Sequence, residues 1–173
     1  IYLNYNSHII KCMNFKLILF FISLTSILLV SSFFYNKPSE ITNNSIHSNE
    51  LLVYMSPTCN CCKNWTKHLS DYGFLIKSKL ENNMNSIKSK AGITSNLVSC
   101  HTAFIDDYVI EGHVPPKDIL KLLSEKPNIK GLSVPGMPAG SNVPGMEVRP
   151  EKANFDVLAI NNDGSTSIWN HYE

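Results

Sequence analysis

Residues 51–65 read LLVYMSPTCNCCKNW, and this stretch decides the fold. Its first five residues form a short apolar run that predicts a buried strand. Ser-Pro-Thr then interrupts the run, and the cysteines that follow open a helical pattern. Four side chains at helical spacing predict the inward face of that helix: Cys62, Trp65, Leu69 and Tyr72. Gly73 ends the helix, so the fold begins with a strand joined to a helix by a cysteine-rich turn.

The same alternation continues along the chain. Residues 74–78 predict a second strand, and residues 82–91 predict a short helix that ends at a glycine. Two apolar runs, at 102–105 and 108–110, predict a hairpin. The next helix begins at Pro115-Pro116, and four of its side chains are predicted to point inward: Ile119, Leu120, Leu122 and Leu123.

The last part of the chain adds a loop and a hairpin. Residues 131–148 are rich in Pro, Gly and Met and are predicted to be irregular. Residues 155–160 and 167–169 flank an Asn-Asp-Gly turn, which predicts a β-hairpin. The order β-α-β-α-β-β-α, followed by these additions, predicts an α/β domain over residues 50–173 with a thioredoxin-like arrangement.

The cysteine-rich turn carries the strongest chemical signal. Cys59 and Cys62 form a Cys-x-x-Cys pair at the start of a helix, where the helix dipole favours thiolates. A thiolate serves both as a nucleophile and as a metal ligand. Cys61 adds a third thiol, which exceeds the needs of one redox pair. A structural disulfide beside a buried free thiol is the plainer alternative.

Cys100 and His101 form a second group of candidate ligands. In a thioredoxin-like fold, the loop before the strand at 102–105 faces the Cys-x-x-Cys pair. Redox enzymes of that fold usually carry a cis-proline in this loop, and our alignment of the hairpin places His101 at its position. We therefore expect the Cys100 sulfur to lie within bonding reach of the first three. The alternatives are a resolving disulfide partner at Cys100 and an ordinary loop histidine at His101.

Two methionines form a third group. Val134-Pro135-Gly136-Met137 recurs as Val143-Pro144-Gly145-Met146, so two matched turns would each present a thioether. Thioethers select soft cations, above all Cu(I). Both methionines could instead fill gaps over the core. His113, in the turn before the Pro-Pro helix, is either a further ligand or a loop histidine.

The first fifty residues differ in character from the rest. Met13 and Lys16 precede an uncharged apolar run from Leu17 to Tyr35, which predicts a signal peptide or an N-terminal membrane anchor over residues 1–35. Translation is expected to start at Met13, which leaves residues 1–12 upstream. Residues 36–49 predict a polar linker. The domain would then be periplasmic or otherwise extracytoplasmic, where cysteines form disulfides, hold metal or do redox work.

The charge balance limits the class of partner. The chain has 15 Lys and Arg and 14 Asp and Glu, for a formal net charge of +1 at pH 7. No basic patch is visible that could follow a phosphate backbone, which argues against nucleic-acid binding. No glycine-rich phosphate loop or carboxylate pair stands out either. The residues instead favour a metal ion as the partner.

Four motifs together resemble the domain of unknown function 411 family of CopG-like proteins. They read MSPTCNCCKNW at 55–65, SCHTA at 99–103, VIEGHVP at 109–115 and GLSVPGMP at 131–138. The resemblance spans about residues 50–172 and implies a thioredoxin-like fold, copper binding through the cysteines and a periplasmic role in copper tolerance. Carried over by position, the implied ligands are Cys59, Cys61, Cys62 and Cys100, with Met137 or Met146 nearby. This chain departs from the family pattern at Asn60, where glycine is expected, and in a slightly longer segment at 141–143.

Two functions are therefore considered for the domain. The first is binding of copper, as one or more Cu(I) ions exchanged with other copper-handling proteins; zinc would also accept four thiolates. Its candidate ligands are Cys59, Cys61, Cys62, Cys100, Met137, Met146, His101 and His113. The second is a thiol-disulfide or copper oxidoreductase, in which Cys59 attacks and Cys62 resolves the mixed disulfide. A purely structural disulfide domain is a weaker third reading.

Overall fold

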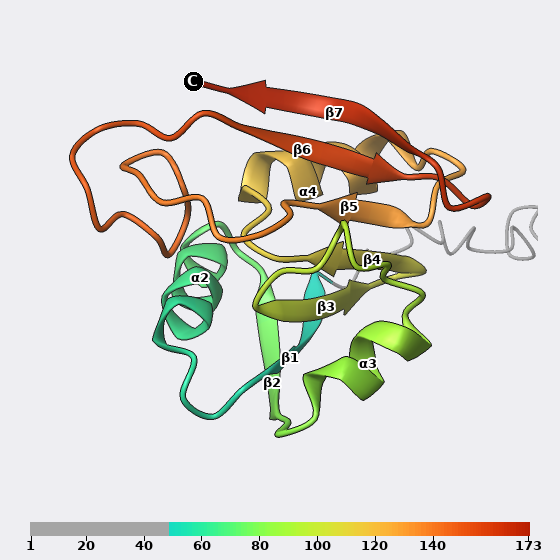
Figure 1. The fold of residues 1–173 in the computed structure, drawn as a ribbon, viewed down its shortest axis with the longest axis horizontal. Coiled ribbons are helices and arrows are strands. Elements are labelled where there is room, and N and C mark those ends of the chain that lie inside the picture. Colours follow the sequence, from blue (N-terminus) through green and yellow to red (C-terminus); the bar gives the residue numbers. More distant parts are fainter. Residues whose placement is uncertain (1–48) are drawn as a thin grey trace, which may run out of the picture. The chain divides into compact units, whose positions relative to one another are not determined.

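The computed structural model describes residues 49–173. The predicted signal peptide or anchor over 1–35, and nearly all of the predicted linker, lie outside the described residues. Within residues 49–173, no helix has the length and apolar character that crossing a membrane requires. This part of the chain forms one mixed seven-stranded sheet with three helices, in the strand order β2-β1-β3-β4-β5-β6-β7 (Figure 1).

The first seven elements follow the predicted order of strands and helices. They are β1 (Glu50–Met55), α2 (Asn60–Asp71), β2 (Leu75–Leu80), α3 (Met84–Lys90), β3 (His101–Ile105), β4 (Tyr108–Glu111) and α4 (Pro116–Glu125). β1 runs parallel to β2 and antiparallel to β3, and β3 and β4 form the predicted hairpin. The α/β class and the order β-α-β-α-β-β-α are thereby confirmed.

The C-terminal part contains one strand that the sequence analysis missed. β5 (Gly131–Ser133) pairs in parallel with β4, although the whole of 131–148 was predicted to be irregular. The three residues pair with Val109, Ile110 and Glu111, and Leu132 is fully buried there. β6 (Phe155–Ile160) and β7 (Thr166–Tyr172) confirm the C-terminal hairpin, with a longer second strand than predicted.

The sheet has a buried core on each of its faces. Alternate residues of β1, namely Leu51, Val53 and Met55, pack with side chains of α2 and α4. A smaller cluster that includes Val109 lies on the face toward α3, where Phe104 packs against it. The site described below lies where β1 leads into α2 and where the chain enters β3 (Figure 1).

Two side chains predicted to point inward do not. Tyr72 is 42% exposed, because it follows the last residue of α2 and stacks on His68 instead of continuing the apolar face. Leu120 is 38% exposed, because Ile119 and Leu122 already occupy the face of α4 that meets the sheet. The remaining inward predictions for the two helices are confirmed.

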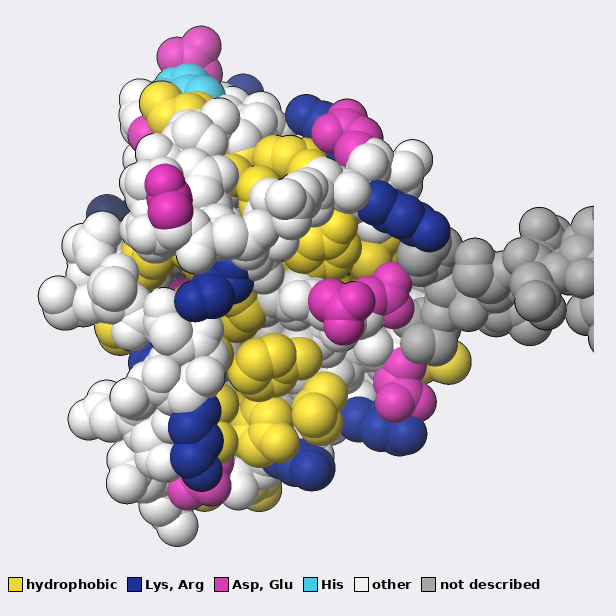
Figure 2. Space-filling model, turned by 90° about the vertical axis from the view of Figure 1, so that its right-hand side faces the viewer, with side chains coloured by type: hydrophobic (Ala, Val, Ile, Leu, Met, Phe, Trp, Pro, Cys, Tyr) yellow, Lys and Arg dark blue, Asp and Glu magenta, His cyan; other side chains and the backbone are white. Residues whose placement is uncertain are grey.

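The surface at the right of Figure 1 exposes apolar side chains among Lys, Arg, Asp and Glu side chains (Figure 2). An open pocket of about 290 Å³ lies between α3 and the sheet, lined by Tyr54, Ile87, Lys90, Ala91 and Phe104. It contains no thiol or imidazole, and it is therefore separate from the candidate metal ligands.

Candidate metal centre

The cysteine-rich turn places three sulfurs at the N-terminus of α2. Cys59 caps the helix with an extended backbone (φ −78°, ψ 92°), and Cys61 and Cys62 lie in the first turn. No acidic residue occupies that turn, so no carboxylate competes for the positive end of the helix dipole. Cys62 is fully buried, whereas Cys59 and Cys61 are half-buried. The three sulfurs therefore lie at the boundary between core and solvent.

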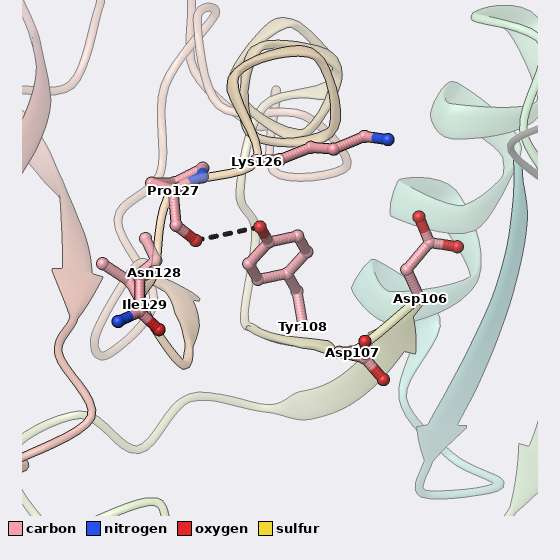
Figure 3. A pocket seen from close by; sticks show the side chains of 7 residues that line it. All are labelled: Asp106, Asp107, Tyr108, Lys126, Pro127, Asn128 and Ile129. Carbon is pink, nitrogen blue, oxygen red and sulfur yellow. Dashed lines mark hydrogen bonds between the residues drawn. The ribbon is translucent and has the colours of Figure 1, made fainter.

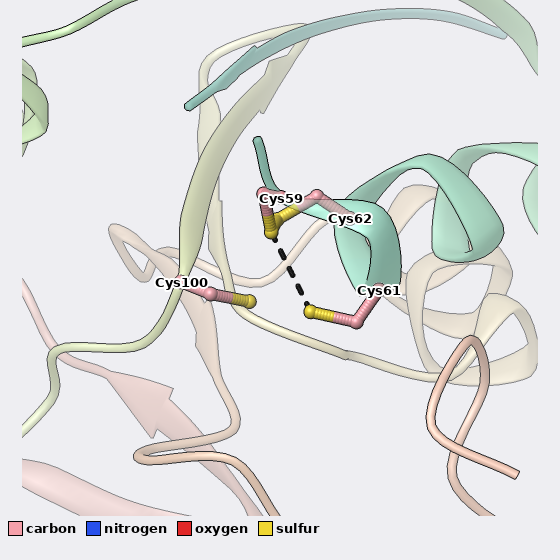
Figure 4. A group of neighbouring side chains, drawn as sticks. All are labelled: Cys59, Cys61, Cys62 and Cys100. Carbon is pink, nitrogen blue, oxygen red and sulfur yellow. Dashed lines mark hydrogen bonds between the residues drawn. A yellow bond between two sulfur atoms is a disulfide. The ribbon is translucent and has the colours of Figure 1, made fainter. Parts of the chain in front are cut away.

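Cys100 brings a fourth sulfur to the same place. The four sulfurs all lie within 4.8 Å of one another, and the sulfurs of Cys61 and Cys100 point toward each other (Figure 4). The strand register explains this approach, because His101 pairs with Met55, the last residue of β1 before the cysteine turn. The predicted juxtaposition of Cys100 with the first three cysteines is confirmed.

The sulfurs are in a partly oxidised state. Cys59 and Cys62 form a disulfide, whereas Cys61 and Cys100 are free thiols (Figure 4). The Cys61 sulfur lies 3.5 Å from that of Cys59. The disulfide agrees with the alternative of a structural disulfide between Cys59 and Cys62. Cys100, considered above as a resolving partner, is a free thiol in this state. Binding of an ion by all four sulfurs therefore requires prior two-electron reduction of the pair.

Cys100 is a neutral thiol in this environment. Burial raises the pKa of Cys100 to about 12, and the neighbouring Cys61 adds to the increase. A cation bound to the Cys100 sulfur would stabilise its thiolate form, so the ion and the proton compete for the same atom.

His113 is fully buried and turned toward Cys100. Its Nδ1 lies 2.7 Å from the carbonyl oxygen of Pro144, which can only accept, so Nδ1 carries the proton. Nε2 then presents a lone pair 3.0 Å from the Cys100 sulfur. Burial lowers the pKa of His113, which keeps the imidazole neutral. Metal-binding histidines are commonly fixed in this way, with one ring nitrogen held by a carbonyl and the other free to bind.

His101 is also fully buried and incompletely bonded. Its Nδ1 lies 3.3 Å from the Cys100 sulfur, and its Nε2 has no hydrogen-bond partner among residues 49–173. Burial and the neighbouring His113 hold the pKa of His101 well below its usual value. The ring packs against that of Trp65, with centroids 4.2 Å apart. Ligand atoms of Cys100, His101 and His113 all lie within 4.8 Å of one another, so Cys100 belongs to two groups of potential ligands.

The two Val-Pro-Gly-Met turns pack on different elements of this centre: the first on the segment before Cys100, and the second on α2. In the first turn, Gly136 N–H donates to the carbonyl of Val98 (2.9 Å), two residues before Cys100. In the second turn, Gly145 lies so close to α2 that an added Cβ would be 2.8 Å from the Cys61 carbonyl oxygen. The turns place their thioethers at different depths: Met146 is half-buried against the core, and Met137 is 62% exposed.

The sequence analysis missed a buried ion pair behind Cys100. Lys88 Nζ lies 2.6 Å from Glu111 Oε1, and both side chains are almost fully buried. The position of Lys88 could have revealed it, because Met84 lies four residues before it and Ala91 three residues after it, on the same helical face. A lysine among apolar residues on one face indicates a buried acidic partner.

A larger pocket lies elsewhere, and its lining contains no cysteine or histidine. It has a volume of about 630 Å³, and its lining comprises Asp106, Asp107, Tyr108, Lys126, Pro127, Asn128 and Ile129 (Figure 3). The Tyr108 hydroxyl donates to the Pro127 carbonyl at 2.9 Å, and burial raises the pKa of Tyr108. The pocket lies at the tip of the β3–β4 hairpin, at the opposite end of β3 from His101.

Comparison with known proteins finds one matching family and two similar solved structures. The family described as "Protein of unknown function, DUF411" matches residues 97–146, which include Cys100, His113 and both methionine turns. Two solved structures of a copper resistance protein, copG, are each 39% identical to this chain. The match to form 2 has a TM-score of 0.68 and covers 72% of this chain and 98% of that one. The match to form 1 has a TM-score of 0.66 and covers 71% and 96%. No curated protein matches the sequence.

Proposed function

Because this chain belongs to the DUF411 family, we propose that it binds copper and acts in copper tolerance. One observation carries the proposal: the sulfurs of Cys59, Cys61, Cys62 and Cys100 lie within 4.8 Å of one another. The similarity to a copper resistance protein extends over nearly the whole of that protein, which supports copper as the cargo.

The donor set fits a soft cation. Thiolates bind Cu(I), and the Nδ1 of the buried His101 lies 3.3 Å from the Cys100 sulfur, so an imidazole nitrogen stands beside the thiols as a further donor. Cys100 is shared by both groups of ligand atoms, so the site has ligands for more than one ion. Zinc would also accept four thiolates, whereas Met146 and Met137 as further ligands favour Cu(I).

The proposal also covers the cellular location and the fold of the domain. The predicted export segment over residues 1–35 supports a periplasmic or other extracytoplasmic location, either free or anchored to the membrane. The cysteine turn between β1 and α2 supports a thioredoxin-like arrangement. An ion held at the boundary between core and solvent could be exchanged with other copper-handling proteins.

Combining Cys59→Ser with Cys62→Ser is expected to lower the number of Cu(I) ions bound per chain, because two of the four thiolates are lost. Anaerobic titration of the reduced protein against a chromophoric Cu(I) chelator measures this number. Asn60→Ser is the matched control, since it changes an exposed side chain in the same turn without removing a sulfur. A double variant that binds as many ions as the parent would contradict the proposed function.

The Cys59–Cys62 disulfide favours a second candidate function, thiol-disulfide exchange. In this reaction, the Cys59 thiolate attacks a substrate disulfide and releases one substrate thiol. Cys62 then displaces the second thiol from the mixed disulfide, which leaves the Cys59–Cys62 disulfide. This reaction needs no metal.

Insulin reduction distinguishes the two functions. If copper binding is the function, the metal-free protein is expected to accelerate insulin reduction by dithiothreitol only marginally. Comparing rates with and without Cu(I), and for Cys59→Ser, measures this contribution. Fast metal-free turnover that Cys59→Ser abolishes would instead favour the oxidoreductase.

A further inference from the structure

Glu111, the last residue of β4, is a fully buried carboxylate that accepts hydrogen bonds from three directions. Its Oε1 lies 2.6 Å from Lys88 Nζ and 2.6 Å from the backbone nitrogen of Ser99. Its Oε2 accepts from the Thr102 hydroxyl at 2.7 Å. One side chain thus joins α3, β3, β4 and the segment that carries Cys100.

Apart from Glu111, that segment is bonded mainly to residues 133–136, and Gly136 N–H donates to the Val98 carbonyl. Residues 97–100 belong to no strand apart from an isolated bridge between Ser99 and Gly136. The Ser99 hydroxyl donates to the Gly136 carbonyl at 2.5 Å, and the Leu97 carbonyl accepts from Ser133. Glu111 is the acceptor for the backbone N–H of Ser99, directly before Cys100.

The space around Ser99 leaves little freedom. A Cβ on Gly112 would overlap the Ser99 side chain and the Val134 carbonyl oxygen. The backbone at Gly112 is therefore tightly packed between Ser99 and Val134. In the residue that follows Ser99 along the chain, the sulfur of Cys100 faces that of Cys61 (Figure 4). A shift of the Ser99 backbone would therefore move the Cys100 sulfur relative to the other three.

The ion pair is poorly explained as a source of stability alone. Removing two charges from water costs free energy that largely offsets their attraction, and apolar replacements of buried ion pairs are often neutral or stabilising. Lys88 and Glu111 are 7% and 0% exposed, so this cost applies to both. Only an anionic carboxylate accepts from Lys88, Ser99 and Thr102 together without presenting a donor of its own.

We propose that Glu111 is a positioning residue for Cys100. Its carboxylate, neutralised by Lys88, holds the Ser99 N–H and thereby keeps the Cys100 sulfur directed at the cysteines of α2. The inference rests on the proposed function for its role in copper binding. The placement of Cys100 is a separate property, which can be measured without metal.

Two double variants separate the hydrogen bond from the charge. Glu111→Leu with Lys88→Met removes both charges and the acceptor for Ser99 N–H. Glu111→Gln with Lys88→Met also removes both charges but keeps a carbonyl oxygen as acceptor. Competition with a chromophoric chelator measures Cu(I) affinity of the reduced chain, and mass spectrometry measures the rate at which iodoacetamide alkylates Cys100 in the reduced, metal-free chain.

The leucine double variant is expected to lose about 10- to 100-fold in Cu(I) affinity, as metal sites do when an outer hydrogen-bond partner is removed. Its Cys100 is expected to be alkylated several-fold faster, because the segment is released. The glutamine double variant is expected to remain close to the parent in both measurements. Parental values for the leucine variant, or equal losses in both variants, would overturn the proposal.

Asp118→Asn is the control for a general loss of stability. Asp118 is 2% exposed and accepts from Asn170 and Tyr172, away from the cysteines. The Asp118→Asn variant is expected to lower the urea midpoint without changing the Cu(I) affinity or the rate of Cys100 alkylation. If it changed both the affinity and the alkylation rate, this would count against a specific role for Glu111. Glu111→Asp keeps a negative charge to neutralise Lys88 but shortens the side chain, which draws the acceptor oxygen away from Ser99 N–H. It too is expected to bind Cu(I) more weakly and to expose Cys100.

The two proposals fail in different ways. A parent chain that does not bind Cu(I) would remove the proposed function, while the alkylation rates would still decide the role of Glu111. A parent that binds Cu(I) tightly, with a leucine variant that binds equally well, would remove only the role of Glu111.

Discussion

Cys100→Ser is expected to lower Cu(I) affinity by more than about 100-fold, since the loss of an outer hydrogen-bond partner alone costs about 10- to 100-fold. The reason is that the Cys100 sulfur belongs both to the four-cysteine group and to the group with His101 and His113. A serine hydroxyl is a hard donor that a soft cation does not favour. Chelator competition under anaerobic conditions, with the ultraviolet absorbance of Cu(I)–thiolate bonds as a second signal, measures the loss.

Val98→Ala is the control for this prediction. Val98 lies in the same segment, and its side chain is 38% exposed. Its carbonyl bond to Gly136 comes from the backbone and survives the change. We expect this variant to bind like the parent. If Cys100→Ser also retained parental affinity, copper would not be bound by a centre that includes this sulfur.

Gly145→Ala is expected to destabilise the domain by about 2–5 kcal/mol, which combines the penalties for overpacking and for a left-handed backbone. Gly145 has φ +78°, and an added Cβ would lie 2.5 Å from the backbone nitrogen of Trp65 and 2.8 Å from the Cys61 carbonyl oxygen. Backbone atoms of a helix cannot turn aside as a flexible side chain could. The second methionine turn must therefore move away from α2, which a lower urea midpoint would report.

Gly136→Ala is the matched control, because it occupies the same position in the first Val-Pro-Gly-Met turn. Gly136 has φ +68°, but nothing lies within 4 Å of an added Cβ. Only the backbone penalty applies, so a loss of about 1–2 kcal/mol is expected. Equal losses in the two variants would show that the contact between the second turn and α2 is not tight.

The order of elements was readable from local patterns. The apolar run at 51–55, the helix face of Cys62, Trp65 and Leu69, and the two hairpins each follow from spacing that neighbouring residues impose. The strand β5 was not readable, because its three residues become a strand only through pairing with β4. The exposure of Tyr72 likewise depends on where α2 ends, which the apolar spacing does not define.

The sequence predicted that the four cysteines meet, but not the interactions that hold them in place. The approach of Cys100 to the first three cysteines follows from the expected strand arrangement. The carbonyl of Pro144 that orients His113, and the carboxylate of Glu111 that binds Ser99, depend on contacts between distant segments. The disulfide between Cys59 and Cys62 reflects a redox state, which residue spacing does not encode.

The bond from His113 to the Pro144 carbonyl makes the site late to form during folding. A chain synthesised from its N-terminus exposes the thiols at α2 well before β3, and the loop that contains Pro144 follows only after α4. Early thiols without their neighbours are open to wrong pairing with each other or with other chains. An ion that reaches the finished domain meets every donor at once, whereas one that reaches the growing chain meets only the first three sulfurs.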